Sequence, residues 1–244
     1  MTTRLDRVSV PESARIDSRF PTDFLWGVVT SPYQIGGAAF EDGRMAYIWD
    51  TFSRVPGAVL GGHNGDIACA HYHRMHEDVD LVAGLGVAPT ASRCPGPESS
   101  PAAGARRTGV AWTSTIAWWT DCWDAVRCLG PPCVRLGREY PAVPLYVTEN
   151  GAAFDDAAPD QDGLVHDADR AAYFREYLDA VADARADAAD VRGYFACSLL
   201  DNFEWGYGYG KRFGIVHVDY GTQVSIVKQS GRWFSDAISG NRKG

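Results

Sequence analysis

Two apolar, β-prone runs separated by an amphipathic helix constrain the fold of this chain more than any other feature. The first run, VPLYVT, leads to Glu149, and the second is YFACSLL, residues 194–200. Between them a helix is expected to start at Asp167 or Asp169. Its apolar face comprises Phe174, Tyr177, Leu178 and Val181. Strand, helix and strand in this order are typical of a parallel α/β architecture.

Both runs end in polar residues. Glu149 is followed by Asn-Gly, and the second run continues into Asp201, Asn202 and Glu204. In barrels of alternating strands and helices, catalytic residues lie at the carboxyl ends of the strands. Taken alone, Glu149 and Glu204 could equally be surface carboxylates, and Trp205 a core aromatic residue.

The N-terminal part shows the same alternation. FLWGVVT, residues 24–30, suits a buried strand, and a helix is expected over residues 66–83, ending at Gly84 or Gly86. The apolar face of that helix would comprise Ala68, Tyr72, Met75, Val79 and Val82. Residues 88–135 lack any such period: a Pro/Gly/Ser-rich stretch precedes four clustered tryptophans, and this segment is expected to be irregular.

Composition excludes several classes of function. With 23 basic and 31 acidic residues the net charge is -8, which disfavours nucleic acid as a partner. Neither a signal-peptide core nor a membrane-spanning run is present, so a cytoplasmic location is expected. The spacing of the six cysteines matches no zinc pattern, and His71, His73 and His76 are expected on a solvated helix face. A redox role for Cys122, Cys128 and Cys133 is the minor alternative.

Motifs at both ends of the chain resemble glycoside hydrolase family 1, the β-glucosidase family of retaining (β/α)8-barrel enzymes. DFLWGVVTSPYQIGGA, IWDTFS and the helix GDIACAHYHRMHEDVDLVAGLGV carry the likeness at the front. LYVTENG, SLLDNFEW and RFGIVHVDY carry it at the back. The resemblance implies that Glu149 holds the position of the nucleophile and that Gln34, Glu204 and Trp205 bind the sugar. The resemblance implies neither a cofactor nor a metal, and it implies that the chain binds a small β-glycoside or sugar.

The resemblance also suggests how the middle of the chain arose. Codons compatible with the family segment YRFSVSWPRVQP, read in a shifted frame, give TASRCPGPESSP, which is residues 90–101. The same shift relates residues 109–123 to an amphipathic helix of the family type. A single-base deletion near codon 88, followed by a large deletion that restores the frame before about Val134, would explain both stretches.

Several family features are missing. A retaining glycosidase needs a second carboxyl group that protonates the leaving oxygen, and the Asn-Glu-Pro motif that carries it in this family does not occur here. The His-Trp sugar contact, the Asn-x-Tyr site and the arginine expected beside Glu149 are missing as well. Cys197 replaces the usual platform tryptophan, and Gly36 replaces a usual glutamate.

The expected fold is therefore an α/β, incomplete TIM (β/α)8 barrel that retains strands resembling the first, seventh and eighth. It forms one truncated domain over residues 1–244, with barrel parts at 1–87 and 136–244 and the irregular segment 88–135 between them. A small parallel sheet with YFACSLL at its centre, its inner face and edges open, is expected to self-associate. Two functions remain open: a retaining β-glycosidase, or a catalytically inactive fragment of a decayed β-glucosidase gene that binds sugar weakly at most.

Overall fold

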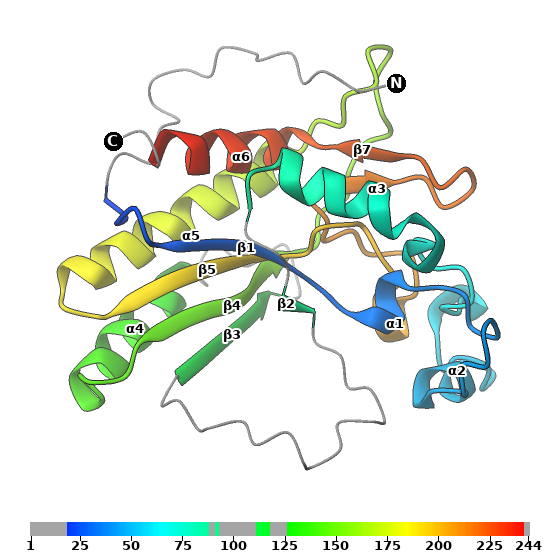
Figure 1. Cartoon of the computed structure of the whole chain (residues 1–244), viewed down its shortest axis with the longest axis horizontal. Coiled ribbons are helices and arrows are strands. Elements are labelled where there is room, and N and C mark those ends of the chain that lie inside the picture. Colours follow the sequence, from blue (N-terminus) through cyan, green and yellow to red (C-terminus); the bar gives the residue numbers. More distant parts are fainter. Residues whose placement is uncertain (1–18, 88–90, 93–110, 118–125, 242–244) are drawn as a thin grey trace.

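The computed structural model describes residues 19–87, 91–92, 111–117 and 126–241, and its centre is a five-stranded parallel sheet (Figure 1). The strand order across the sheet is β2-β1-β5-β4-β3. The strands are β1 (Leu25–Thr30), β2 (Ala91–Ser92), β3 (Ala111–Ala117), β4 (Leu145–Ala152) and β5 (Val191–Cys197). A separate antiparallel pair consists of β6 (Val216–Val218) and β7 (Ser225–Val227).

The helices alternate with these strands along the chain. They are α1 (Pro32–Ile35), α2 (Ile48–Phe52), α3 (His71–Gly84), α4 (Val126–Glu139), α5 (Ala168–Ala186) and α6 (Gln229–Asn241). The expected helix beginning at Asp167 or Asp169 is confirmed as α5, whose cap residue is Asp167. None of the described helices combines the length and the apolarity needed to cross a membrane.

The predicted pairing of the three apolar runs is present, with β5 between β4 and β1. β1 and β5 run in register from Leu25 opposite Gly193 to Val29 opposite Cys197. The expectation that β1 and β4 form open edges was wrong, because β2 pairs with β1 and β3 pairs with β4. Among the described strands, the outermost ones are therefore β2 and β3.

Part of the segment 88–135, expected to be irregular, is regular in the structure. Residues 111–117 form β3, which pairs with β4 over its whole length, and α4 begins at Val126. Parallel pairing with β4 gives this stretch regular structure, even though its sequence lacks an apolar period. Residues 88–90, 93–110 and 118–125 lie outside the described part of the chain.

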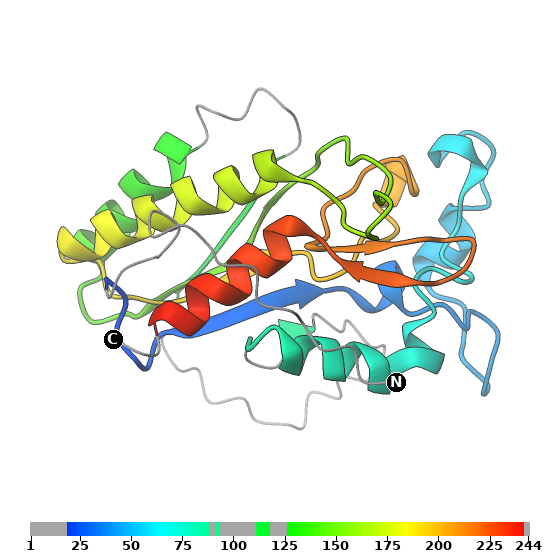
Figure 2. The same cartoon turned by 90° about the horizontal axis from the view of Figure 1, so that it is seen from above.

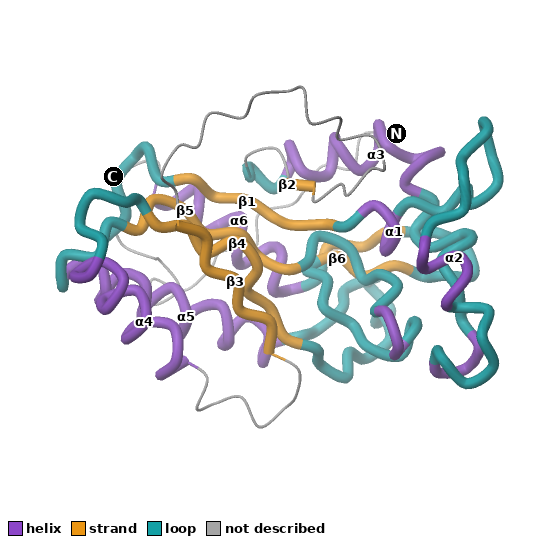
Figure 3. Tube along the Cα trace, turned by 90° about the horizontal axis from the view of Figure 1, so that it is seen from below, coloured by secondary structure: helices purple, strands orange, loops and turns teal. Residues whose placement is uncertain are grey.

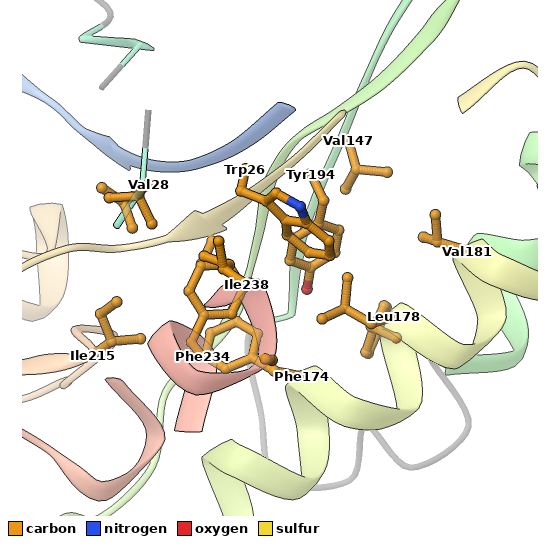
Figure 4. Packing of buried hydrophobic residues seen from close by; sticks show 14 of the residues in the cluster. Trp26, Val28, Val147, Phe174, Leu178, Val181, Tyr194, Ile215, Phe234 and Ile238 are labelled. Atoms are coloured by element: carbon orange, nitrogen blue, oxygen red, sulfur yellow. The ribbon is translucent and has the colours of Figure 1, made fainter. Parts of the chain in front are cut away.

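One continuous apolar core lies between the sheet and the helices (Figure 4). Seen from above, α5 and α6 lie in front of the strands, and from below the strands lie in front (Figures 2 and 3). The four residues expected on the apolar face of α5 are all fully buried. They pack with Trp26 of β1, Tyr194 of β5 and Phe234 of α6. Burying the ring of Phe234 alone contributes on the order of 2 kcal/mol.

The other face of the sheet is partly covered by its own aromatic rings. A Cβ atom on Gly27 would lie 2.2 Å from the ring of Phe195, so the absence of a side chain there makes room for that ring. Gly193 accommodates the ring of Tyr146 in the same way, at 2.8 Å. Gly193 lies inside β5, which begins three residues before the expected YFACSLL run. Leu25, on the same face, remains 45% exposed.

Helix α3 differs from its expected form in two respects. It begins at His71 rather than Asp66, because the preceding Ala68 and Ala70 adopt left-handed backbone angles. Its expected apolar face is largely exposed: Tyr72, Met75 and Val79 are 53%, 49% and 56% accessible. In the described part of the chain this face borders an open groove of about 720 Å³, whose other lining residues come from the end of β1, α1, the loop that follows α1 and Leu199. The predicted end at Gly84 is confirmed.

Candidate functional site

The carboxyl ends of β1, β4 and β5 lie at the same end of the sheet, where α1 and α2 also lie (Figure 1). A cavity of about 330 Å³ opens there. Its described lining consists of Val29, Thr30, Ser31, Gln34, Glu149, Cys197, Ser198, Glu204, Trp205 and Phe213. All four residues expected from the sequence to form a sugar site line this one cavity. Its size suits a small molecule.

Glu149 reaches the cavity because β4 is irregular at this point. The β4–β5 register shifts between Val147 and Asn150, so Thr148 and Glu149 fall outside the regular pairing. Such a bulge redirects the side chains that it contains. Asn150 restores the pairing: it is fully buried, donates to the Tyr173 hydroxyl at 3.1 Å and accepts a hydrogen bond from the Tyr194 hydroxyl.

Gln34 connects the first strand with the loop that follows β5. Its side-chain nitrogen donates to Asn202 Oδ1 and to Glu204 Oε2, both at 3.1 Å. The side chain of Asn202 in turn donates to Ser198 Oγ and to the carbonyl of Leu200, both at 3.0 Å. Residues separated by about 170 positions in the sequence thus form one hydrogen-bonded group, and Asn202 is a member that sequence reasoning had not assigned to the site.

Trp205 is held by other aromatic rings. Its indole stacks on Tyr33 at an interplanar angle of 10° and lies 4.7 Å from the ring of Trp49. Its backbone φ of 46° is left-handed, which costs a non-glycine residue on the order of 1 kcal/mol. The short 3-10 helix Trp205–Tyr207 therefore fixes this side chain in one position beside the cavity.

Burial changes the acid–base behaviour of Glu204. The carboxyl group is only 6% exposed, and this desolvation raises its pKa from 4.5 to about 7, against the opposing effect of the Gln34 hydrogen bond. Glu149 and the Cys197 thiol line the same cavity, and no basic residue occurs in its described lining. Glu204 is thus partly protonated at neutral pH.

Glu204→Gln is expected to flatten part of the dependence of stability on pH. Because the pKa of Glu204 is higher in the folded chain, its contribution to stability is complete below pH 4.5 and is lost as the pH rises through about 7. The wild-type chain should therefore lose roughly 3 kcal/mol across this interval relative to the variant. Urea unfolding at several pH values measures the difference. Glu77→Gln, on the exposed face of α3, should leave the profile unchanged, and a parallel wild-type and Glu204→Gln profile would refute the assignment.

Cys197 is a further residue that lines the cavity. Burial and the nearby carboxylates of Glu204 and Glu149 raise the pKa of its thiol, so it is present as the neutral thiol. The peptide bond between Cys197 and Ser198 is cis. A thiol offers no ring face for stacking, and the aromatic residues in the described lining are Trp205 and Phe213.

An ionic network that the sequence did not reveal lies behind the site. It joins Asp156, Asp167, Arg170, Asp201, Arg212 and Lys228. Arg170 donates to Asp167 at 2.6 Å, and Lys228 donates to Asp201 at 2.7 Å. Both cations are fully buried, which is sustainable only with such partners. Charged residues spaced irregularly along a chain give no periodic signal, so only the folded structure reveals the cluster.

The described residues contain no group of three His, Cys, Asp or Glu side chains able to hold a metal ion. His71 pairs with Asp78 at 2.5 Å, and His73 with Glu41 at 2.9 Å, so two of the three histidines of α3 are engaged in ion-pair geometry. Cys133 is buried, which raises the pKa of its thiol to about 11 and suppresses thiolate chemistry. Cys122 and the side chain of Cys128 lie outside the described part.

The sequence matches the model of glycosyl hydrolase family 1 over residues 16–94 and 96–243. It is 51% identical over 130 residues to the thermostable beta-glucosidase B of Thermobispora bispora, covering 53% of this chain and 26% of that protein. A longer alignment, with a beta-glucosidase of Agrobacterium sp., is 24% identical over 446 residues and covers 93% of this chain and 97% of the relative. That alignment is longer than the chain itself, so the relative contains residues that have no counterpart here.

The fold is similar to that of a solved beta-glucosidase from Thermotoga maritima in complex with glucoimidazole. The TM-score is 0.76 at 22% identity, with 92% of this chain and 99% of the other covered. The α/β architecture of this chain is therefore of the same type as the fold of that beta-glucosidase. The chain spans about a quarter of the length of the first curated relatives that it matches.

Proposed function

Because the chain belongs to glycosyl hydrolase family 1, we propose that it binds β-glucosides and retains the nucleophilic half of a retaining β-glycosidase. Glu149 is the nucleophile, and Gln34, Glu204 and Trp205 hold the sugar. One observation carries this assignment: the four side chains, drawn from both ends of the sequence, line a single cavity.

The names of relatives support a glucose-like ligand. The T. bispora and T. maritima proteins are beta-glucosidases, and the T. maritima enzyme has been solved with glucoimidazole and with deoxynojirimycin. The cavity of this chain offers acceptors, Glu149 and Glu204, suited to the many hydroxyl donors of a sugar, beside the aromatic face of Trp205.

A second candidate is a sugar-binding remnant that turns nothing over. Glu149 and Glu204 are the only carboxyl groups in the described lining of the cavity, and the family motif that carries the proton donor is missing from the sequence. This candidate rests on the same cavity and on gene decay over residues 88–133. Resequencing the gene tests that origin: an unshifted reading frame without similarity to the family would contradict it.

We also propose that the isolated chain self-associates. The edges of β2 and β3 end the sheet, and the exposed apolar side chains of Tyr72, Met75 and Val79 line an open groove. Parallel sheets are normally closed or covered on both sides. A single monomeric species in sedimentation, over a wide range of concentration, would exclude it.

Ligand titration tests the proposed function directly. Glucoimidazole added to the chain should change the fluorescence of Trp205, and this change should be lost in Trp205→Phe. In Glu204→Ala the affinity for glucoimidazole should fall about tenfold. Release of 4-nitrophenol from its β-glucoside, abolished by Glu149→Ala, would establish turnover. Binding without turnover favours the remnant, and an absence of both results refutes a sugar site altogether.

A further inference from the structure

The loop that carries Asn202 and Glu204 is anchored immediately before these two residues. Asp201 is fully buried, and its Oδ1 accepts hydrogen bonds from Lys228 Nζ at 2.7 Å and from the Gly214 amide at 3.0 Å. Its Oδ2 accepts from Arg212 at 2.7 Å. Its backbone amide donates to the carbonyl of Val216 at 2.9 Å. Asp201 thus fixes both the side chain and the backbone at the entrance of the loop.

The anchor continues into the sugar site through Asn202. The Asn202 carbonyl accepts from the Tyr220 hydroxyl at 3.2 Å, and its side chain accepts from Gln34, which also donates to Glu204. The Phe203 amide donates to the backbone carbonyl of Gln34 at 3.1 Å. A displacement of Asp201 would therefore shift Asn202 and Phe203, both of which contact Gln34, the residue that donates to the Glu204 carboxyl.

Lys228 is the central cation of the anchor. It is fully buried and bridges Asp201 and Asp156, while its backbone amide donates to the carbonyl of Ile215 at 3.0 Å. Removing its charge would leave two buried carboxylates with one cation fewer, an unfavourable arrangement that is relieved if the loop opens to water. Lys228 immediately precedes α6 and is not part of the described lining of the cavity, so any effect of it on a bound sugar is indirect.

We propose that Lys228 and Asp201 are positioning residues of the sugar site: their buried ion pair holds the Asn202–Glu204 loop closed over Gln34 and so sets the burial and geometry of Glu204. The effect of this ion pair on sugar binding rests on the proposed function. Its effect on the position and burial of Glu204 concerns the chain alone and is measurable without a ligand.

The variant Lys228→Met, of similar length but neutral, tests the role. With the loop released, Glu204 becomes hydrated, and its pKa should fall from about 7 toward its ordinary value of 4.5. The carboxyl-carbon NMR resonance of Glu204, assigned by its loss in Glu204→Gln, reports this pKa. Affinity for glucoimidazole should fall at least about tenfold in the same variant.

Ser230→Ala is the matched control. Ser230 lies two residues from Lys228 in the same network, but its hydroxyl contacts Asp167 rather than Asp201. The control should lower the unfolding midpoint modestly and leave the Glu204 resonance unchanged. An equal shift in both variants would reveal general loosening of the fold and would overturn the positioning role.

The variant Arg212→Gln keeps the proposal testable if the Lys228→Met chain does not fold. Arg212 is one-quarter exposed and contacts the other oxygen of Asp201, so its loss should be tolerated and should lower the Glu204 pKa in the same direction by a smaller amount. An unchanged Glu204 pKa in folded Arg212→Gln and Lys228→Met overturns the proposal. If the wild-type chain fails to bind glucoimidazole, the proposed function fails, while the NMR titration still decides whether Lys228 positions Glu204.

Discussion

Gly151→Ala is expected to lower the free energy of unfolding of the chain strongly. A Cβ atom at this position would lie 1.6 Å from the carbonyl oxygen of Cys197 and 2.7 Å from its carbonyl carbon. Both atoms belong to the backbone at the end of β5, the central strand, so no flexible side chain can yield. Forcing the strands apart here would cost roughly 4 kcal/mol or more, a large share of the stability of an ordinary domain.

Urea unfolding followed by circular dichroism measures this loss. Gly84→Ala is the matched control, because a Cβ atom on Gly84 meets nothing within 4 Å and the residue lies in helix α3. Alanine there should leave stability unchanged or raise it by up to about 1 kcal/mol. A Gly151→Ala chain with the wild-type unfolding midpoint would show that β4 and β5 do not approach each other as described.

Turnover, where it occurs, should depend steeply on the leaving group. As the proposed nucleophile, Glu149 would attack the anomeric carbon, but with the family's proton-donor motif missing from the sequence an alkyl glucoside would have to expel an unprotonated alkoxide. The lost general-acid catalysis is worth about 10²–10⁴-fold in rate. We therefore expect 2,4-dinitrophenyl β-glucoside to react and methyl β-glucoside to remain intact, since only the former leaves readily without a proton.

Comparison of three chains makes this result interpretable. Glu149→Ala should abolish the reaction of the activated glucoside, whereas Glu204→Gln should weaken binding and preserve the preference for the activated leaving group. Comparable rates on both glucosides in the wild-type chain would contradict the absence of a proton donor. If Glu204→Gln then removed only the alkyl reaction, the partly protonated Glu204 would be that donor.

The order of the central strands could be predicted because the family resemblance implies three strands that are neighbours in a closed barrel, with YFACSLL between the other two. β5 lies between β4 and β1, and all four expected site residues meet at one cavity. The expected identity of these strands as the first, seventh and eighth of a barrel stays a prediction. The positions of Gln34 and Glu204 followed from motif resemblance rather than from any period in the sequence.

Other parts could not be predicted, for physical reasons. The stripe of Tyr72, Met75 and Val79 reads as a buried helix face, but an apolar pattern predicts burial only if a neighbouring element is present to cover it. β3 carries no apolar alternation and is defined by its register with β4. The Lys228–Asp201 pair depends on loops folding back over long distances, which local patterns do not encode.

The parallel pairing of β1 with β5 has a consequence for protein engineering. The cavity draws on residues 29–34 from one side of this pairing and on residues 149–213 from the other, and the two groups meet through backbone pairing and the Gln34 amide. A chain cut between residues 95 and 105 would yield two pieces, each with half of a ligand pocket. Ligand capture by the mixed pieces would then serve as a split reporter, with a signal that appears only when the two pieces find each other.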